Sequence, residues 1–309
     1  VPVKVKNFEW KTIFNWSKNN SMVESLPEGI DKIQIGSGVY NVKSYAEVGK
    51  PYGAIYAKTF KRDAEGYILC QLDGSPKEGQ DYEYLGCVQA DWRGGWNNVF
   101  RLGNFSFSVM FDFQKGGKFF SQTSIQSSVD GQSVKSLEGR DADFFSRKIL
   151  GESDEERYGF MRPQNANTPT ANGQVYPDWG RPKGVVLPNC RYDEDVEGLA
   201  GQQVLGYCTP ERYWMHYTSR DISRFIYDAS YVKLREITVS YDLPKKWLRK
   251  TPFQTFRVAA VGRNIATLFA NTPHGLDPQA TSTTGNAQGF ERGFNLPSAT
   301  YGFDIKVSF

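Results

Sequence analysis

The sequence predicts an all-β protein whose antiparallel strands cross a membrane. Three observations support this prediction. Apolar and polar residues alternate over segments of about ten residues, as they do in transmembrane β-strands. Aromatic residues make up 15% of the 309 positions, including 21 Phe and 17 Tyr. No segment approaches the roughly 20 consecutive apolar residues that a membrane-spanning helix needs.

The clearest strand is predicted at residues 104–114. Four Phe and one Val occupy its odd-numbered positions from 105 to 113, and the even-numbered positions are polar except for Met110. Strict period-2 alternation indicates a strand with one apolar side. Soluble cores use Val, Ile and Leu more often than Phe, so this row favours a surface that meets lipid.

Six further segments carry the strand pattern. They are residues 7–20, 53–60, 94–102, 230–243, 255–264 and 300–309. The alternation in 230–243 slips once near Arg235 and Glu236, which predicts a β-bulge. In 300–309, aromatic or aliphatic residues occupy every second position from Tyr301 to Phe309. The seven segments together predict seven strands of one sheet.

The connections between these segments are very unequal in length. Residues 103–104 and 244–252 form short turns, whereas residues 116–229 have little periodicity and are predicted to be one long loop. Long loops at one end and short turns at the other are typical of outer-membrane barrels. If the last strand runs towards the periplasm, the 116–229 loop is extracellular. The same alternation places residues 21–51 in the periplasm, although their length suits the outside.

The net charge and the first ten residues limit the classes of protein to which the chain can belong. A net charge of +3 is too small to indicate nucleic-acid binding. The opening "VPVKVKNFEW" has no initiator Met and no signal-peptide core, so we expect the chain to be part of something longer.

The four cysteines form two local pairs along the sequence. They are Cys70, Cys87, Cys190 and Cys208, and none has the spacing of metal ligands. Four cysteines allow three connectivities. We favour Cys70–Cys87 and Cys190–Cys208 disulfides, which suit an oxidising compartment. Free thiols are the alternative.

No catalytic constellation is recognisable. His216 and His274 are the only histidines, and neither has a Cys, Asp or Glu at ligand spacing. The carboxylates of Asp193–Glu197 lie in loop-like sequence, whereas a glycosidase needs two carboxylates held at a fixed separation. We therefore expect no enzymatic activity, no cofactor and no metal.

Aromatic residues in the long loop are the candidate ligand contacts. They are Trp179, Tyr192, Tyr213 and Trp214, and Asn, Asp and Arg residues accompany them. Exposed aromatic rings stack on sugar faces or hold a peptide. The alternative is that these rings pack the loop against itself or against a neighbouring protein.

The C-terminal third carries a specific series of motifs. "SYVKLREITVSYDLPKKWL", "FRVAAVGRNIATLF" and "GLDPQ" follow one another and precede an alternating strand that ends at Phe309. This series resembles the C-terminal end of SusC/RagA-type TonB-dependent outer-membrane transporters. "NFEWKTIFNWSKNNSMVESL" and "VGKPYGAIYAKTF" resemble the preceding barrel segments of that family.

The chain departs from the family in two places. The run "QLDGSPKEGQDYEYLG" lacks the regular oxygen spacing of a Ca-loop-like segment, so no cation site is carried over. An N-terminal plug domain and a TonB-contacting segment are absent from this chain. We therefore expect residues 1–309 to be the C-terminal part of the barrel.

The resemblance implies the remaining properties. It implies a plugged barrel of about 22 strands, multi-pass in a Gram-negative outer membrane, in contact with outer-membrane lipid. It implies import of an oligosaccharide or peptide, driven by TonB through the missing N-terminal part. It also implies a SusD-like surface lipoprotein partner and an assembly of two SusC–SusD pairs. Tyr301, Phe303 and Phe309 resemble the signal read by the barrel-insertion machinery.

Two other functions stay open at this point. One is a passive porin or a surface-binding barrel, which an energy-coupling segment elsewhere in the protein would exclude. The other is a soluble, secreted β-rich binding module, which recovery without detergent would support.

Overall fold

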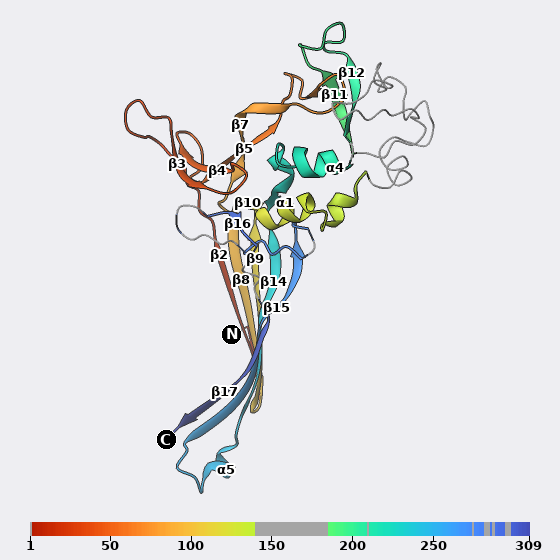
Figure 1. Cartoon of the computed structure of the whole chain (residues 1–309). Helices are drawn as coiled ribbons and strands as arrows, with labels where there is room; N and C mark the ends of the chain where they lie inside the picture. The colour runs from red at the N-terminus through yellow and green to blue at the C-terminus, as the bar shows by residue number, and fades with distance from the viewer. Residues whose placement is uncertain are drawn as a thin grey trace.

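The computed structural model describes residues 2–139, 185–208, 210–273, 275–280, 285, 288–293 and 298–309. A tall twisted sheet carries a lobe of smaller sheets and short helices at one end (Figure 1). Within the described ranges, no helix is long and apolar enough to cross a membrane.

The tall sheet, called the wall sheet below, has seven strands. In spatial order they are β1 (Val3–Val5), β2 (Phe8–Ser17), β8 (Trp92–Leu102), β9 (Phe105–Lys115), β14 (Tyr231–Asp242), β15 (Thr255–Ala270) and β17 (Thr300–Ser308). Every neighbouring pair is antiparallel. Six of the seven predicted strands lie here, and β1 was not predicted.

Short turns join strands at the end far from the lobe. Leu102 pairs with Phe105 across the predicted turn at Gly103 and Asn104. Gly103 adopts a positive φ of 57°, which this tight turn requires and which glycine tolerates without strain. The helix α5 (Lys245–Leu248) lies in the second of these turns (Figure 1).

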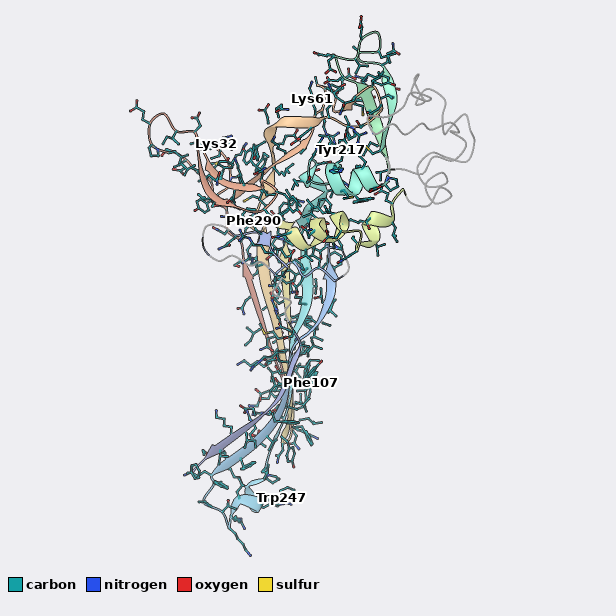
Figure 2. All side chains as sticks on the ribbon, viewed as in Figure 1. Lys32, Lys61, Phe107, Tyr217, Trp247 and Phe290 are labelled. Atoms are coloured by element: carbon teal, nitrogen blue, oxygen red, sulfur yellow. The ribbon has the colours of Figure 1, made fainter. Side chains whose placement is uncertain are left out.

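One face of the wall sheet is aromatic and exposed. Phe105 and Phe107 are 59% and 40% exposed, and Figure 2 marks the position of Phe107 along the wall sheet. Rings from adjacent strands stack on one another, as Trp10 does on Phe100 with centroids 6.0 Å apart. So large an apolar face is unusual for a protein surrounded by water.

Two indole N–H groups on the aromatic face are satisfied within the sheet. The indole N–H of Trp10 donates to Asn98 Oδ1 at 3.1 Å, and that of Trp96 donates to Thr12 Oγ1 at 2.8 Å. Such pairing is required where no water is at hand to accept a hydrogen bond. The face is therefore built for an apolar environment, as the alternation predicted.

The predicted bulge in β14 is confirmed. The pairing of β14 with both β9 and β15 shifts register between Leu234 and Glu236, so Arg235 is the extra residue. The Arg235 guanidinium donates from Nε to Asp112 Oδ2 at 2.8 Å. A bulge re-aims the side chain that it carries, and this one directs a cation to the edge of the lobe.

Three connections between wall strands build the lobe. The first connection is residues 18–91, the second is residues 116–230 and the third is residues 271–299. The described part of the lobe contains three small sheets. The first consists of β3 (Lys32–Ser37), β4 (Lys43–Glu47), β5 (Ala54–Phe60) and β7 (Glu78–Cys87), and the second of β12 (Gln203–Cys208), β11 (Val185–Tyr192) and β6 (Ile68–Cys70). The third consists of β13 (Ile226–Asp228), β10 (Lys118–Ser121) and β16 (Phe290–Glu291). Its helical elements are α1 (Gln122–Val129), η1 (Val134–Leu137), α4 (Pro210–Arg212), η2 (Tyr213–Tyr217) and η3 (Ile222–Phe225).

The prediction that residues 53–60 form a wall strand is wrong. They form β5, which pairs with β4 and β7 inside the lobe. The residues Ala54 to Ala57 are buried on both faces of the strand, with exposures of at most 4%. Such a strand reads as a continuous apolar run and does not meet lipid.

Removing β5 from the wall also corrects the side assigned to residues 21–51. Because β2 is followed in the wall by β8, the whole first connection lies at the lobe end (Figure 1). The second connection is likewise no structureless loop, since its described parts carry strands and helical turns that pack together.

The hydrophobic core lies in the lobe and not in the wall sheet. Its buried members come from all three connections, for example Phe60, Trp214 and Phe290, each at most 2% exposed. A Cβ on Gly38 would lie 3.1 Å from the Phe290 ring, so a larger residue at this position would require the ring to shift. The lobe therefore folds as one packed unit.

A buried carboxylate joins the first and second connections. Asp193 is 2% exposed and accepts hydrogen bonds from Lys61 Nζ at 2.9 Å and Lys77 Nζ at 2.8 Å. Burial by itself raises the pKa of this carboxyl, but the hydrogen bonds from the two lysines outweigh burial and hold the pKa at about 2. The ionised form is thus favoured by folding.

We expect replacement of Phe107 by Lys to destabilise the folded protein in lipid by about 2–4 kcal/mol, because the substitution puts a charge on the lipid-facing side. The urea midpoint in lipid vesicles measures this effect. Ser108→Lys is the matched control, since Ser108 lies on the opposite face, and it should change the midpoint much less. Equal losses for both variants would contradict a lipid-facing aromatic row.

The lobe should lose stability in acid through Asp193. Its pKa is lower in the folded state than the ordinary value of 3.8. The stabilisation is therefore complete above about pH 4 and is lost as the pH falls towards 2. Melting curves of the purified protein between pH 6 and pH 2.5 measure this loss. The Asp193→Asn variant should melt earlier at pH 6 and show a weaker dependence on pH; an unchanged slope would show that other carboxyls dominate.

Candidate functional site

Two adjoining hollows lie where the wall sheet meets the lobe. Each has a volume of about 300 Å³. The first is lined by Ser17, Asn19, Val88, Gln89, Ala90, Trp92, Arg93 and Gln288. The second is lined by Val88, Arg93, Gln114, Lys118, Phe119, Ala229, Pro278, Gln279, Gln288 and Gly289. Together they form the mouth pocket, in which amide side chains are the commonest polar groups.

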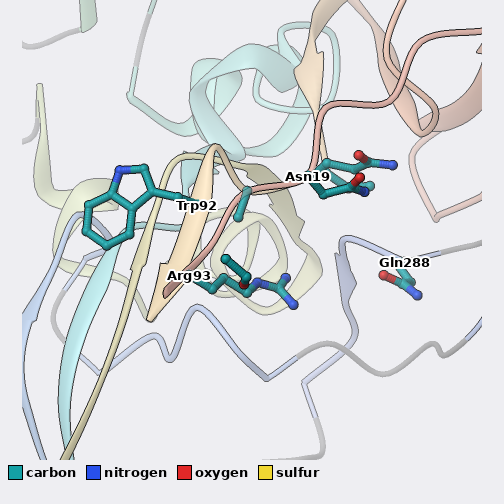
Figure 3. A pocket seen from close by; sticks show the side chains of 8 residues that line it. Asn19, Trp92, Arg93 and Gln288 are labelled. Atoms are coloured by element: carbon teal, nitrogen blue, oxygen red, sulfur yellow. The ribbon is translucent and has the colours of Figure 1, made fainter. Parts of the chain in front are cut away.

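Arg93 and Gln288 line both hollows. Arg93 is the second residue of β8, where it pairs with Ser17 of β2 and Gln114 of β9. Its guanidinium extends into the space between β8 and the segment that carries Gln288 (Figure 3). Among the described residues, no carboxylate forms an ion pair with Arg93. An exposed guanidinium with five N–H donors is thus available to a ligand.

Close packing of small residues fixes the floor of the mouth pocket. The Val88 side chain packs directly against two glycines. A Cβ atom added to Gly53 would lie 2.6 Å from Val88, and one added to Gly289 would lie 2.2 Å from it. Gly289 has a φ of 86°, and its carbonyl accepts a hydrogen bond from Phe120 N at 2.8 Å. These contacts place Gln288 over the end of β8.

A polar network supports the opposite rim of the mouth pocket. Lys233 of β14 is 4% exposed and donates to both Asp277 carboxylate oxygens, at 2.5 and 2.6 Å, and to Gln279 Oε1 at 2.9 Å. Arg235, at the bulge, also donates to Gln279. The "GLDPQ" motif is therefore held against the wall sheet by its Asp and Gln. The sequence showed this motif but not its partners.

The structure places three of the predicted ligand-binding aromatics in the lobe core. Tyr192, Tyr213 and Trp214 are at most 2% exposed. The Tyr213 ring packs edge-on against Trp214 with centroids 5.1 Å apart, and the Trp214 indole donates to Glu138 O at 3.1 Å. Burial raises the pKa of Tyr213 to about 12. The expectation that they face a ligand is corrected, because loop packing covers them. Trp179 lies outside the described residues.

The two expected disulfides are not formed. Cys70, Cys87 and Cys208 are free thiols, which excludes both the Cys70–Cys87 and the Cys190–Cys208 bond in this structure. Cys87 lies apart from the other three, and its thiol donates to Tyr52 O at 3.3 Å. The predicted pairs joined cysteines that are close in the sequence. In the structure, Cys70 and Cys190 instead belong to paired strands of different connections.

The residues of the predicted assembly signal lie on or beside β17. Tyr301, Phe303 and Phe309 are 76%, 86% and 77% exposed. Tyr301 and Phe303 share one face of the strand, and Phe309 packs edge-on against Phe253 with centroids 5.3 Å apart. Their role in barrel insertion stays a prediction. Among the described residues, no group of three or more His, Cys, Asp or Glu is arranged to hold a metal ion.

Known proteins resemble this chain in sequence or in fold. No protein-family model matches the sequence. The chain is 23% identical over 318 residues to "TonB-dependent receptor P3" of Formosa agariphila, and the match covers 96% of this chain and 26% of that protein. Two solved structures, titled the RagAB peptide transporter and the RagAB peptide importer in the "closed-closed" state, each match with a TM-score of 0.55 and 15% identity, covering 99% of this chain and 28% of theirs.

The present chain thus spans about a quarter of the length of the proteins that it matches. Those proteins are a receptor and a transporter and not enzymes, which agrees with the expected lack of enzymatic activity. The match runs along nearly the whole chain, and the fold shares the antiparallel strands of RagA. The chain is therefore similar, along nearly its whole length, to a segment of a TonB-dependent receptor, and its fold resembles part of the RagAB transporter, as the SusC/RagA resemblance predicted.

Proposed function

We propose that this chain forms part of the wall and the extracellular lobe of an outer-membrane importer driven by TonB. The observation that carries the proposal is the division of the structure into two environments. The wall sheet exposes an aromatic face suited to lipid, whereas the lobe at one end holds the water-excluding core. Strands outside this chain complete the barrel, since β1 and β17 each pair with only one described strand.

The mouth pocket is the proposed contact with the transported ligand. It lies where a molecule entering the barrel from the lobe end passes the ends of β8 and β9. Its side-chain amides include those of Asn19, Gln89, Gln279 and Gln288, and its cations are Arg93 and Lys118. Amides both donate and accept hydrogen bonds, as a peptide backbone requires, and a guanidinium binds a carboxylate in two-pronged fashion.

A peptide is therefore the favoured ligand class. The titles of the matched structures also name a peptide as the cargo of RagAB. Oligosaccharides are the second candidate, because sugar hydroxyls pair with the same amides. The burial of Tyr192, Tyr213 and Trp214 removes the rings that were expected to stack on sugar faces. We propose that a SusD-like surface lipoprotein binds the receptor at the lobe. Two of these receptor–lipoprotein pairs form the proposed assembly.

We expect Arg93→Ala to reduce the uptake of short acidic peptides roughly tenfold at subsaturating concentration, since a charge-assisted hydrogen bond contributes about 1.5–3 kcal/mol. Uptake of labelled peptides by intact cells that carry the complete receptor measures this. Arg101→Ala is the matched control, because Arg101 lies on the same strand near the far turn. Equal uptake by the wild type and Arg93→Ala would show that the mouth pocket does not contact the ligand during transport.

The same assay separates the two transport mechanisms. A protonophore should abolish uptake by a TonB-driven importer, because TonB depends on the proton gradient. Uptake that persists with the protonophore would instead support a passive porin. Uptake of labelled oligosaccharides but not of peptides would reverse the ligand assignment.

A further inference from the structure

One face of the first lobe sheet combines tyrosine rings with lysine side chains. The sheet has the order β3-β4-β5-β7, and directly opposite residues of antiparallel strands point to the same face. One face belongs to the lobe interior, where the opposite residues Ser44 and Ile55 are both 0% exposed. The other face, called the Tyr–Lys face below, carries Lys32 of β3, Lys43, Tyr45 and Glu47 of β4, Tyr56 of β5, Tyr82 and Tyr84 of β7, and Lys50, which follows β4.

The rings of the Tyr–Lys face pack against one another. Tyr45 meets Tyr56 edge-on with centroids 5.3 Å apart, and the Tyr84 ring lies 5.7 Å from Tyr56 on the other side. The Tyr56 hydroxyl accepts a hydrogen bond from Lys50 Nζ at 2.5 Å and donates one to Glu47. Tyr56 is therefore only 4% exposed, whereas Tyr84 is 41% exposed. The packed rings form a firm floor for the lysines.

Two lysines lie over these rings. Lys32 Nζ is 5.3 Å from the centroid of Tyr45 and 5.2 Å from that of Tyr56. Lys43 Nζ is 4.3 Å from the centroid of Tyr82. An ammonium group is attracted to the face of an aromatic ring, so each lysine is held in place before a partner arrives. Less conformational entropy is then lost when the lysines bind an anion.

The charges on the Tyr–Lys face do not balance. Its carboxylate, Glu47, forms an ion pair with Lys50 at 2.9 Å. In the part of the chain that the structure describes, no carboxylate lies within ion-pair distance of Lys32 or Lys43. Three lysines and one glutamate leave a net charge of +2 on this face. The two lysines without a carboxylate are therefore free to bind anions from outside.

These two lysines are well separated along the sheet. Lys32 lies opposite Glu47, and Lys43 precedes Glu47 by four residues on β4, so roughly 13 Å separates them along the strand direction. Asp81 and Glu83 alternate with the tyrosines of β7 and so point to the other side of that strand. A fitting partner thus presents carboxylates at two separate places.

We propose that the Tyr–Lys face docks a partner protein whose surface presents carboxylates. Lys32 and Lys43 bind these carboxylates, and the exposed ring of Tyr84 supplies apolar contact, as tyrosine commonly does at protein interfaces. The strands β3 and β4 project from the rest of the lobe (Figure 1), and Figure 2 shows Lys32 on this projecting part. A large partner can therefore reach the face.

Other anionic occupants fit the Tyr–Lys face less well. Recognition of anionic lipid headgroups typically uses clusters of four to eight lysines or arginines, whereas only Lys32 and Lys43 lack a carboxylate here. A glycan chain stacks its sugars on several open rings, but Tyr56 is covered and Tyr84 is the most exposed of the four. The proposal does not depend on the mouth pocket or on the identity of the transported ligand.

Binding of an acidic polypeptide to the complete receptor in detergent tests the proposal. Labelled poly-L-glutamate is the probe, and fluorescence anisotropy measures its binding. We expect binding at low ionic strength that is lost at about 1 M salt, where the Debye length falls to about 3 Å. Lys32→Glu combined with Lys43→Glu should weaken binding roughly tenfold. Lys245→Glu combined with Lys246→Glu, in the far turn, is the matched control and should leave binding unchanged.

Equal binding by the wild type and the Lys32→Glu, Lys43→Glu variant would overturn the proposal. Two further probes identify other occupants. Polygalacturonate carries the same carboxylates on a sugar chain, and phosphatidylglycerol vesicles present lipid phosphates. If either binds more tightly than poly-L-glutamate and loses its binding in the same variant, the assignment to a protein is wrong.

Replacement of Tyr82 tests the role of the rings. Tyr82→Ala removes the ring beneath Lys43 without changing any charge, so we expect several-fold weaker binding of poly-L-glutamate. Tyr82→Phe retains the ring and should bind like the wild type. Melting curves confirm that each variant is folded. Equal binding by the alanine and phenylalanine variants would contradict the ordering of Lys43 by the ring. Failure of these tests leaves the uptake proposal intact, because they measure the Tyr–Lys face and not transport.

Discussion

The structure depends on pairing the backbone of each wall strand with its neighbours while the two faces of the sheet meet different surroundings. Antiparallel pairing on both sides satisfies the N–H and C=O groups of β8, β9, β14 and β15 along most of their length, whereas within the described sheet β17 is paired on one side and β2 is paired with β1 over three residues only. Stacked rings cover one face, and two of their indole N–H groups donate to Asn98 and Thr12. Because lipid offers no hydrogen-bond partner, these two conditions determine where every long strand can lie.

The lobe results from the same separation between residues that can face lipid and residues that cannot. Residues that cannot face lipid gather at one end, where the three connections share one core of buried side chains. Charged links are added within the lobe, between Asp193 and Lys61 and Lys77, and at its junction with the wall sheet, between Lys233 and Asp277. The mouth pocket lies between the two regions because β8 and β9 have their lobe-side ends there and Gly289 packs against Val88, which in turn packs against Gly53. Its position thus results from the junction of the wall sheet with the lobe.

The sequence predicted the parts of the structure that are governed by local alternation. The Phe row of β9, the tight turn at Gly103 and the bulge at Arg235 follow from period-2 patterns, which need no information about distant residues. We predicted a wall strand at residues 53–60, which form β5 in the lobe. A short apolar run has no pattern that separates contact with lipid from burial in a lobe. The burial of Tyr213 and Trp214 and the proximity of Cys70 to Cys190 depend on contacts between the first and second connections. No local pattern carries that information, so the sequence did not reveal the candidate site or the neighbouring positions of these cysteines.

The most direct test of the account is the side of the membrane on which each end of the wall sheet lies. An epitope inserted at Gly198, in an exposed turn of the lobe, and one inserted at Gly103, in the far turn, are probed with antibody on intact and on permeabilised cells. We predict that the Gly198 epitope is labelled on intact cells and that the Gly103 epitope is labelled only after permeabilisation. Labelling of both epitopes on intact cells, or of Gly103 alone, would contradict a sheet that spans the outer membrane with its lobe outside.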